Sequence, residues 1–91
     1  MKIEATSITM ENAAALLDAG AAAIARGDTQ FDLSAVGNVD SAAVALLLAW
    51  RRAARAQGKS LTLTGVPQGL TSLARLYGVE SLLDVERRAL E

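Results

Sequence analysis

Apolar residues recur along the chain at two different spacings. Between residues 10 and 26 they lie three and four positions apart, which is typical of a helix with one buried stripe. The stripe consists of Ala13, Leu16, Leu17, Gly20, Ala21 and Ile24. Thr9 can cap the start of this helix and Gly27 can end it. Around Phe31 and Leu33 the apolar residues instead alternate with polar ones, which predicts a strand over 30–36.

The same two spacings continue to the end of the chain. They predict strands at 2–5 and 60–64, helices at 42–57 and from Pro67 to Gly78, and a short final helix over 79–89 with a tail at 84–91. A turn at 37–38 separates the second strand from the second helix. Strands that alternate with helices in this way favour parallel pairing through right-handed crossovers.

The predicted fold class is therefore α/β: a small, mostly parallel or mixed β-sheet, covered mainly on one face by helices. The strand residues expected to line the core are Phe31, Leu33, Val36, Leu61 and Leu63. The chain has 91 residues, which is the length of one domain, so 1–91 is predicted to form a single domain.

Composition excludes several kinds of chemistry. The chain contains no Cys and no His, so thiol nucleophiles, disulfides and the commonest metal ligands are absent. We therefore expect no enzyme activity, no cofactor and no metal site. No apolar run reaches the roughly 18 residues that span a bilayer, and Glu4 stands where a signal peptide needs apolar residues. A cytoplasmic protein without direct membrane insertion is predicted.

Charge is distributed unevenly along the chain. Residues 1–40 carry two bases and six acids, whereas residues 41–79 carry five bases and no acid. Two interpretations remain open: bases collect where helices end, or they form a basic face for an acidic partner surface or a phosphate. Nucleic acid is not expected as a partner, because the net charge is −1 and no aromatic residues interleave with the bases.

The dipeptide Asp40-Ser41 precedes the second predicted helix. Ser41 can act as an N-cap by accepting hydrogen bonds from helical N–H groups. A helix N-terminus also stabilises anions, so a phosphate on Ser41 would fit there, although the adjacent Asp40 would oppose it. Capping and phosphorylation are thus both possible roles for Ser41.

A helical projection of 42–57 places apolar and basic residues in one sector. Ala43, Leu47, Trp50 and Ala54 lie on the predicted buried side. Arg51, Arg52 and Arg55 mark the solvent side, and Val44 and Leu48 lie in the same sector as these arginines. Either another element covers the two apolar residues, or they form an exposed patch with a basic rim, which is typical of a protein contact.

Several segments carry a resemblance to a known family. The segments are 31–34, 39–44, the Leu-rich helix ending at Gly58 and the strand 61–63, and they resemble the STAS domain of anti-sigma-factor antagonists and transporter-associated modules. Asp40 and Ser41 match the Asp-Ser/Thr-x-Gly motif, whereas Ala43 stands where Gly is usual, and the usual amino-terminal strand pair is shortened to one strand. The stretches 64–67 and 72–79 resemble the MlaB-type subunits of bacterial phospholipid ABC transporters in particular.

The resemblance implies a non-catalytic accessory subunit that binds and stabilises the cytoplasmic ATPase of a phospholipid-transport complex at the cytoplasmic face of the inner membrane. The residues expected to bind this partner are Ser41, Val44, Leu48, Arg51, Arg52 and Arg55. The alternative is an anti-sigma-factor antagonist regulated by phosphorylation of Ser41. A lipid- or nucleotide-binding module that uses the basic face is a third hypothesis, and an enzyme is the fourth. A neighbouring permease gene would favour the first hypothesis, and a neighbouring anti-sigma kinase gene the second.

Overall fold

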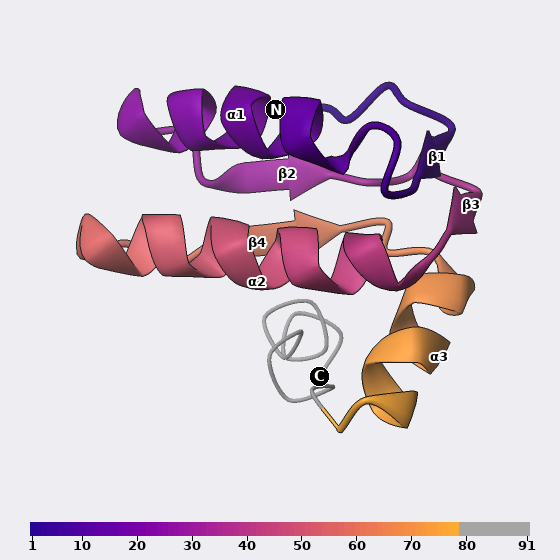
Figure 1. The fold of residues 1–91 in the computed structure, drawn as a ribbon. Helices are drawn as coiled ribbons and strands as arrows, with labels where there is room; N and C mark the ends of the chain where they lie inside the picture. The colour runs from indigo at the N-terminus through magenta and orange to yellow at the C-terminus, as the bar shows by residue number, and fades with distance from the viewer. Residues whose placement is uncertain (79–91) are drawn as a thin grey trace.

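The computed structural model describes residues 1–78, and these form short parallel strands with three helices (Figure 1). The elements, in chain order, are β1 (Ser7–Ile8), α1 (Ala13–Ala25), β2 (Gln30–Asp32), β3 (Asn38–Val39), α2 (Ser41–Ala56), β4 (Thr62–Thr64) and α3 (Gln68–Leu76). Strand β2 pairs with β4 and β1 pairs with β3, and both pairs are parallel. The helix predicted over 79–89 and the tail at 84–91 lie outside the described residues.

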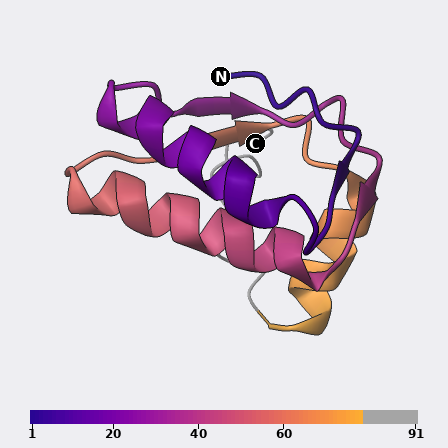
Figure 2. The ribbon, with the colours of Figure 1, turned by 45° about the horizontal axis from the view of Figure 1, so that its top comes forward.

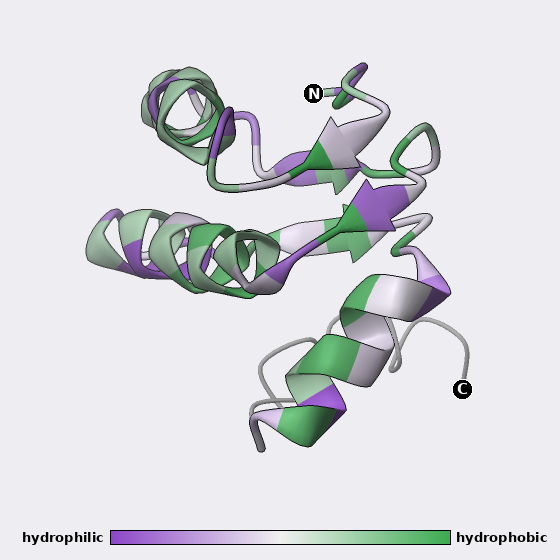
Figure 3. Ribbon diagram, turned by 45° about the vertical axis from the view of Figure 1, so that its right-hand side comes forward, coloured by the Kyte–Doolittle hydropathy of each residue, from purple (hydrophilic) through white to green (hydrophobic). Residues whose placement is uncertain are grey.

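Helices α1 and α2 lie side by side over the same face of the β2–β4 pair (Figures 1 and 2). Figure 3 shows the two helices on one side of the strands, with α3 below the end of the β2–β4 pair. Lys2 adds a parallel bridge to Asp32, so the N-terminal segment runs along the other edge of β2. The predicted class is confirmed: a small parallel β-structure covered mainly on one face by helices.

The boundaries of the first elements differ from the predicted ones. Helix α1 begins at Ala13 rather than residue 10, because the Asn12 side chain holds the preceding turn by accepting from the Thr9 N–H at 2.9 Å and donating to the Ser7 carbonyl at 2.9 Å. The strand predicted at 2–5 is reduced to the bridge at Lys2. The turn predicted at 37–38 is partly strand β3, since Asn38 and Val39 pair with β1.

The core is packed around the rings of Trp50 on α2 and Phe31 on β2. Their centroids are 4.9 Å apart at 85°, an edge-to-face arrangement that adds about 0.5–1.5 kcal/mol beyond the burial itself. All five strand residues predicted to line the core are buried, as are Ala43, Leu47 and Ala54 on α2. A Cβ atom on Gly20 of α1 would lie 2.1 Å from Trp50 Nε1, so the glycine makes room for the indole.

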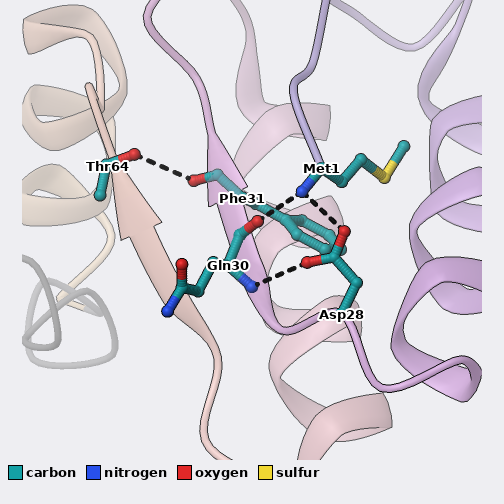
Figure 4. A network of polar contacts seen from close by, with 5 residues as sticks. All are labelled: Met1, Asp28, Gln30, Phe31 and Thr64. Carbon is teal, nitrogen blue, oxygen red and sulfur yellow. Dashed lines mark hydrogen bonds and ion pairs between the residues drawn. The ribbon is translucent and has the colours of Figure 1, made fainter.

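A polar network holds the N-terminal segment beside β2 (Figure 4). The ammonium group of Met1 lies 2.7 Å from the Asp28 carboxylate and donates to the Gln30 carbonyl at 2.6 Å. The other Asp28 oxygen accepts from the Gln30 N–H at 3.2 Å. The hydrogen bond from the terminal ammonium, followed by that from Gln30, lowers the pKa of Asp28. This network belongs to the strands and lies apart from the start of α2.

Candidate partner-binding surface

The N-terminus of α2 is capped by Asp40, not by Ser41. Asp40 has an extended backbone, and its Oδ1 accepts from the Ala42 N–H at 2.8 Å. Ser41 is the first residue of the helix and is exposed, so the predicted capping by Ser41 is wrong. The reason is geometric: the capping oxygen must come from the last non-helical residue, where the side chain can fold back over free N–H groups. Within residues 1–78 the Ser41 hydroxyl makes no side-chain hydrogen bond to another group, which leaves it available at the surface.

The second carboxylate oxygen of Asp40 reaches the turn that precedes α1. Its Oδ2 accepts from the Met10 N–H at 3.2 Å, and the Asp40 N–H donates to the Ile8 carbonyl at 3.2 Å. One carboxylate therefore ties the starts of α1 and α2 to each other, and Figure 2 shows these two helix starts meeting at one corner. Met10 and Asp40, 30 positions apart in the sequence, are thus brought together next to Ser41.

The outward side of α2 forms a continuous ridge. Spacings of four, three, four and three residues place its members within one narrow sector of the helix. We call this surface the α2 ridge, and it consists of Ser41, Ala45, Leu48, Arg52 and Arg55. The ridge extends from Ser41 to Arg55, 14 steps along the helix, or about 21 Å at a rise of 1.5 Å per residue.

Val44 does not belong to this surface. Only 8% of it is exposed, and it lies in the core cluster, so the prediction of an exposed patch around Val44 is wrong. The position of Val44, near the edge of the helical sector, lets α2 turn it inward while Leu48 stays half-buried and packs against the core from outside. The helical period alone does not reveal this, because neighbouring elements decide how much of each helix flank is covered.

A hollow of about 210 Å³ opens on the C-terminal half of the ridge, lined by Leu48, Arg51, Arg52 and Arg55. Arg52 and Arg55 are exposed and Arg51 is half-buried. In the part of the chain from 1 to 78, none of these three guanidinium groups forms an ion pair with a carboxylate. The hollow therefore offers an apolar floor and three cations whose charge is not neutralised by described residues.

A second hollow of about 300 Å³, missed by the sequence analysis, lies between α1 and α2. It is lined by Ala13, Ala14, Leu17, Ala42, Ala45, Leu46 and Ala49. The sequence feature that could have predicted this hollow is the high alanine content of both helices. Small side chains let the helices approach closely and leave a shallow apolar surface between them. We call this surface the alanine hollow, and it borders Ala45 of the α2 ridge.

Titratable and apolar features elsewhere in the described residues complete the picture of this surface. Among residues 1–78 no group of three or more His, Cys, Asp or Glu side chains could hold a metal ion. Among the described residues the pKa is lowered for two carboxyl groups, Asp32 at the end of β2 and Asp28 just before that strand, and neither lies on α2. In the same described part, no helix is both long enough and apolar enough to cross a membrane.

Comparison with known proteins places the chain in a family. The family model described as "Mlab, STAS domain" matches residues 5–84. Two curated relatives, the intermembrane phospholipid transport system binding protein MlaB of Escherichia coli (strain K12) and that of Shigella flexneri, are each 43% identical over 54 residues. These matches cover 59% of this chain and 56% of each relative, so the similarity spans about half of the curated proteins. With most of its length matched by the family model and the parallel α/β fold in agreement, the chain belongs to the STAS domain family.

Proposed function

We propose that this STAS domain is a non-catalytic accessory subunit of a phospholipid-transport ABC complex and binds the cytoplasmic ATPase of that complex through the α2 ridge. The family match and the names of the two relatives support a role in phospholipid transport. The observation that supports the ridge as the binding surface is the half-buried Leu48 beside three guanidinium groups that lack ion pairs in residues 1–78.

We expect the ridge to bind because the apolar centre and the charged rim of an interface contribute differently to affinity. An apolar centre that becomes fully desolvated dominates binding energy, whereas rim charges mainly set the association rate and specificity. Leu48 provides such a centre, and Arg52 and Arg55 provide the exposed rim. We therefore expect the complementary surface on the ATPase to be acidic around an apolar residue. In such a complex this domain would lie at the cytoplasmic face of the inner membrane.

Charge reversal on the ridge tests this proposal without disturbing the core. In the double variant Arg52→Glu/Arg55→Glu, both changed side chains are exposed, so the fold should persist. We expect about tenfold weaker binding of the purified ATPase, mostly through slower association and with a strong salt dependence. The control is Arg26→Glu, a single charge reversal on an exposed residue at the end of α1, which should alter affinity by no more than about twofold; the single variant Arg52→Glu is its matched counterpart on the ridge and should weaken binding by more than that.

Leu48→Asp tests the apolar centre of the same surface. It should weaken binding more severely than the charge reversal, because it places an unpaired charge in a desolvated contact. Leu48 also packs against the core, so Leu48→Ala and thermal unfolding must accompany the binding measurement. Wild-type affinity in the double arginine variant would place the interface elsewhere, and failure of the wild-type chain to bind the ATPase would refute the proposed function.

An anti-sigma-factor antagonist is the second candidate function. The exposed hydroxyl of Ser41, at the first position of α2, favours it, because a kinase can reach this group. Incubation with the anti-sigma kinase of the same organism and ATP should then add phosphate to Ser41 and abolish binding, and a Ser41→Ala variant should remain unmodified. Lack of phosphorylation with an active kinase would exclude this function.

A further inference from the structure

The side chain of Met10 is 81% exposed, more than any other large apolar residue in the part of the chain that the structure describes. A single exposed apolar residue needs no explanation in itself. Met10 differs because of its position: its N–H is bonded to Asp40, directly beside Ser41 at the start of the α2 ridge. It therefore lies at one end of the surface that the proposed function uses.

Several hydrogen bonds fix the backbone of the turn that carries Met10. We call residues 9–12 the Met10 turn. The Asn12 side chain bonds to Ser7 and Thr9, the Thr9 hydroxyl accepts from the Glu11 N–H at 3.3 Å, and the Thr9 carbonyl accepts from the Ala13 N–H at 3.0 Å. With the Met10 N–H bonded to Asp40, the backbone is held both by its own segment and by the residue that caps α2. A contact residue on a pre-ordered backbone loses less conformational entropy on binding.

The Met10 turn is continuous with apolar surface on the helices that follow it. Ala13 and Ala14 of α1 come directly after the turn, and Ala42 and Ala45 lie in the first turns of α2; all four line the alanine hollow. A partner that covers Met10 can therefore continue over the hollow onto the α2 ridge. A partner would then bury the Met10 side chain as the anchor of the contact and cover the small side chains of the alanine hollow around it.

The charges near Met10 are opposite in sign to those at the far end of the ridge. Glu11 is exposed next to Met10, and the Asp40 carboxylate accepts from the Met10 N–H. The nearest basic residue on α2, Arg51, follows Ser41 by ten residues, about 15 Å along the helix axis. The surface that runs from the Met10 turn along the α2 ridge thus has an acidic end beside Met10 and a basic end at Arg52 and Arg55, which gives a docked partner one preferred direction.

We propose that Met10 is a second anchor for the protein partner and that it inserts into an apolar socket with a cationic rim, while the acidic part of the same partner covers the arginines. Asp40 is the positioning residue that presents Met10 beside Ser41. This inference rests on the proposed function for the identity of the partner, the ATPase, but it concerns a different set of residues from those that support that function.

The test measures the affinity of the purified ATPase for the full chain and three variants. Met10→Ser should weaken binding by about 10- to 30-fold, the range of an interface anchor. Met10→Leu should stay within about threefold of the wild type, because it keeps the apolar volume. Glu11→Lys should slow association and do so less at high salt, since it places a cation against a cationic rim.

Peroxide footprinting supplies an independent readout. The Met10 thioether of the free chain should oxidise readily, since oxidation follows exposure, and the bound ATPase should protect it. The inference is overturned, with the proposed function intact, if Met10→Ser binds within twofold of the wild type while the arginine reversal weakens binding. It is also overturned if Glu11→Lys binds more tightly, or if the chain self-associates through Met10 and Met10→Ser only makes it monomeric. No binding by the wild type would refute both proposals.

Discussion

The two sides of α2 are built on different principles. The inner side places Trp50 edge-on against Phe31 and so close to α1 that only a glycine fits at position 20. The outer side carries half-buried Leu48, alanine and arginines that form no ion pair with residues 1–78. The inner side thus packs within the chain and leaves only the indole N–H of Trp50 without a hydrogen-bond partner among the buried side-chain atoms described, while the outer side has apolar and charged groups that another molecule can contact.

This difference shows which substitutions report on the fold and which on binding. Close packing makes the inner side sensitive to one carbon atom, because a rigid indole cannot move away within a dense core. The outer side tolerates changes of charge in the free chain, because exposed arginines remain hydrated. Variants on the two sides should therefore separate stability from affinity, and the following experiments test that separation in order of decreasing effect.

The largest effect on the inner side is expected from Gly20→Ala. The added Cβ would lie 2.1 Å from Trp50 Nε1 and 2.4 Å from Cε2. Overpacking of this kind costs about 1–3 kcal/mol, and the clash with a fully buried ring favours the upper end. The gain in helix propensity returns about 1 kcal/mol, so the net loss should be about 2 kcal/mol in the free energy of unfolding, measured by denaturant titration.

The matched control is Gly69→Ala in α3. A Cβ there would meet Val39 at 3.5 Å, which is an ordinary contact. Because the change restricts the unfolded chain without a clash, it should leave stability equal or raise it by up to about 1 kcal/mol. If both variants respond in the same direction, the close approach of Gly20 to Trp50 does not determine the packing of α1 against α2.

A smaller effect is expected at the start of α2, where the two sides meet. Asp40→Ala removes the cap on Ala42 and the bond to Met10, and caps of this type contribute about 0.5–2 kcal/mol. Ser41→Ala removes an exposed hydroxyl and should change the free energy of unfolding by less than about 0.5 kcal/mol. If Ser41→Ala lowered the free energy of unfolding more than Asp40→Ala, Ser41 would be the capping residue instead of Asp40.

The smallest effect concerns acid. Hydrogen bonding from Ser34, through its side chain and then its N–H, lowers the pKa of Asp32 in the folded state below the ordinary 3.8. The folded state therefore binds fewer protons than the unfolded chain, so this contribution to stability is present above about pH 4 and is lost as the pH falls further.

Asp32→Asn should remove part of this acid sensitivity. Thermal unfolding followed from pH 6 to pH 3 should show a smaller decrease in Tm for the variant than for the wild type. Helix α2 contains no acidic residue between 41 and 56, so the charge of its outer side stays constant over the same range. An identical pH profile in wild type and variant would show that the hydrogen bonds to Asp32 do not persist in solution.

Local pattern alone was sufficient for much of this protein. Alternation at Phe31, Leu33, Leu61 and Leu63 predicted strands with one buried face, and all four are buried. The three-and-four spacing predicted α1 and α2 and the buried side of α2. The Asp40-Ser41 pair, with the segments around it, indicated the STAS family, which the family match confirms. These features are local because burial of one face imposes a period of 2 or 3.6 on the sequence itself.

Contacts between distant segments decided the rest. Two-residue strands such as β3 carry no alternation, so only pairing with β1 defines them. The burial of Val44 and the fit of Gly20 to Trp50 depend on how α1, α2 and their neighbours pack. The placement of Met10 beside Ser41 depends on a carboxylate that joins residues 30 positions apart. Periodicity describes a helix by itself, whereas capping, burial at a helix flank and the composition of a surface depend on which other element lies next to it.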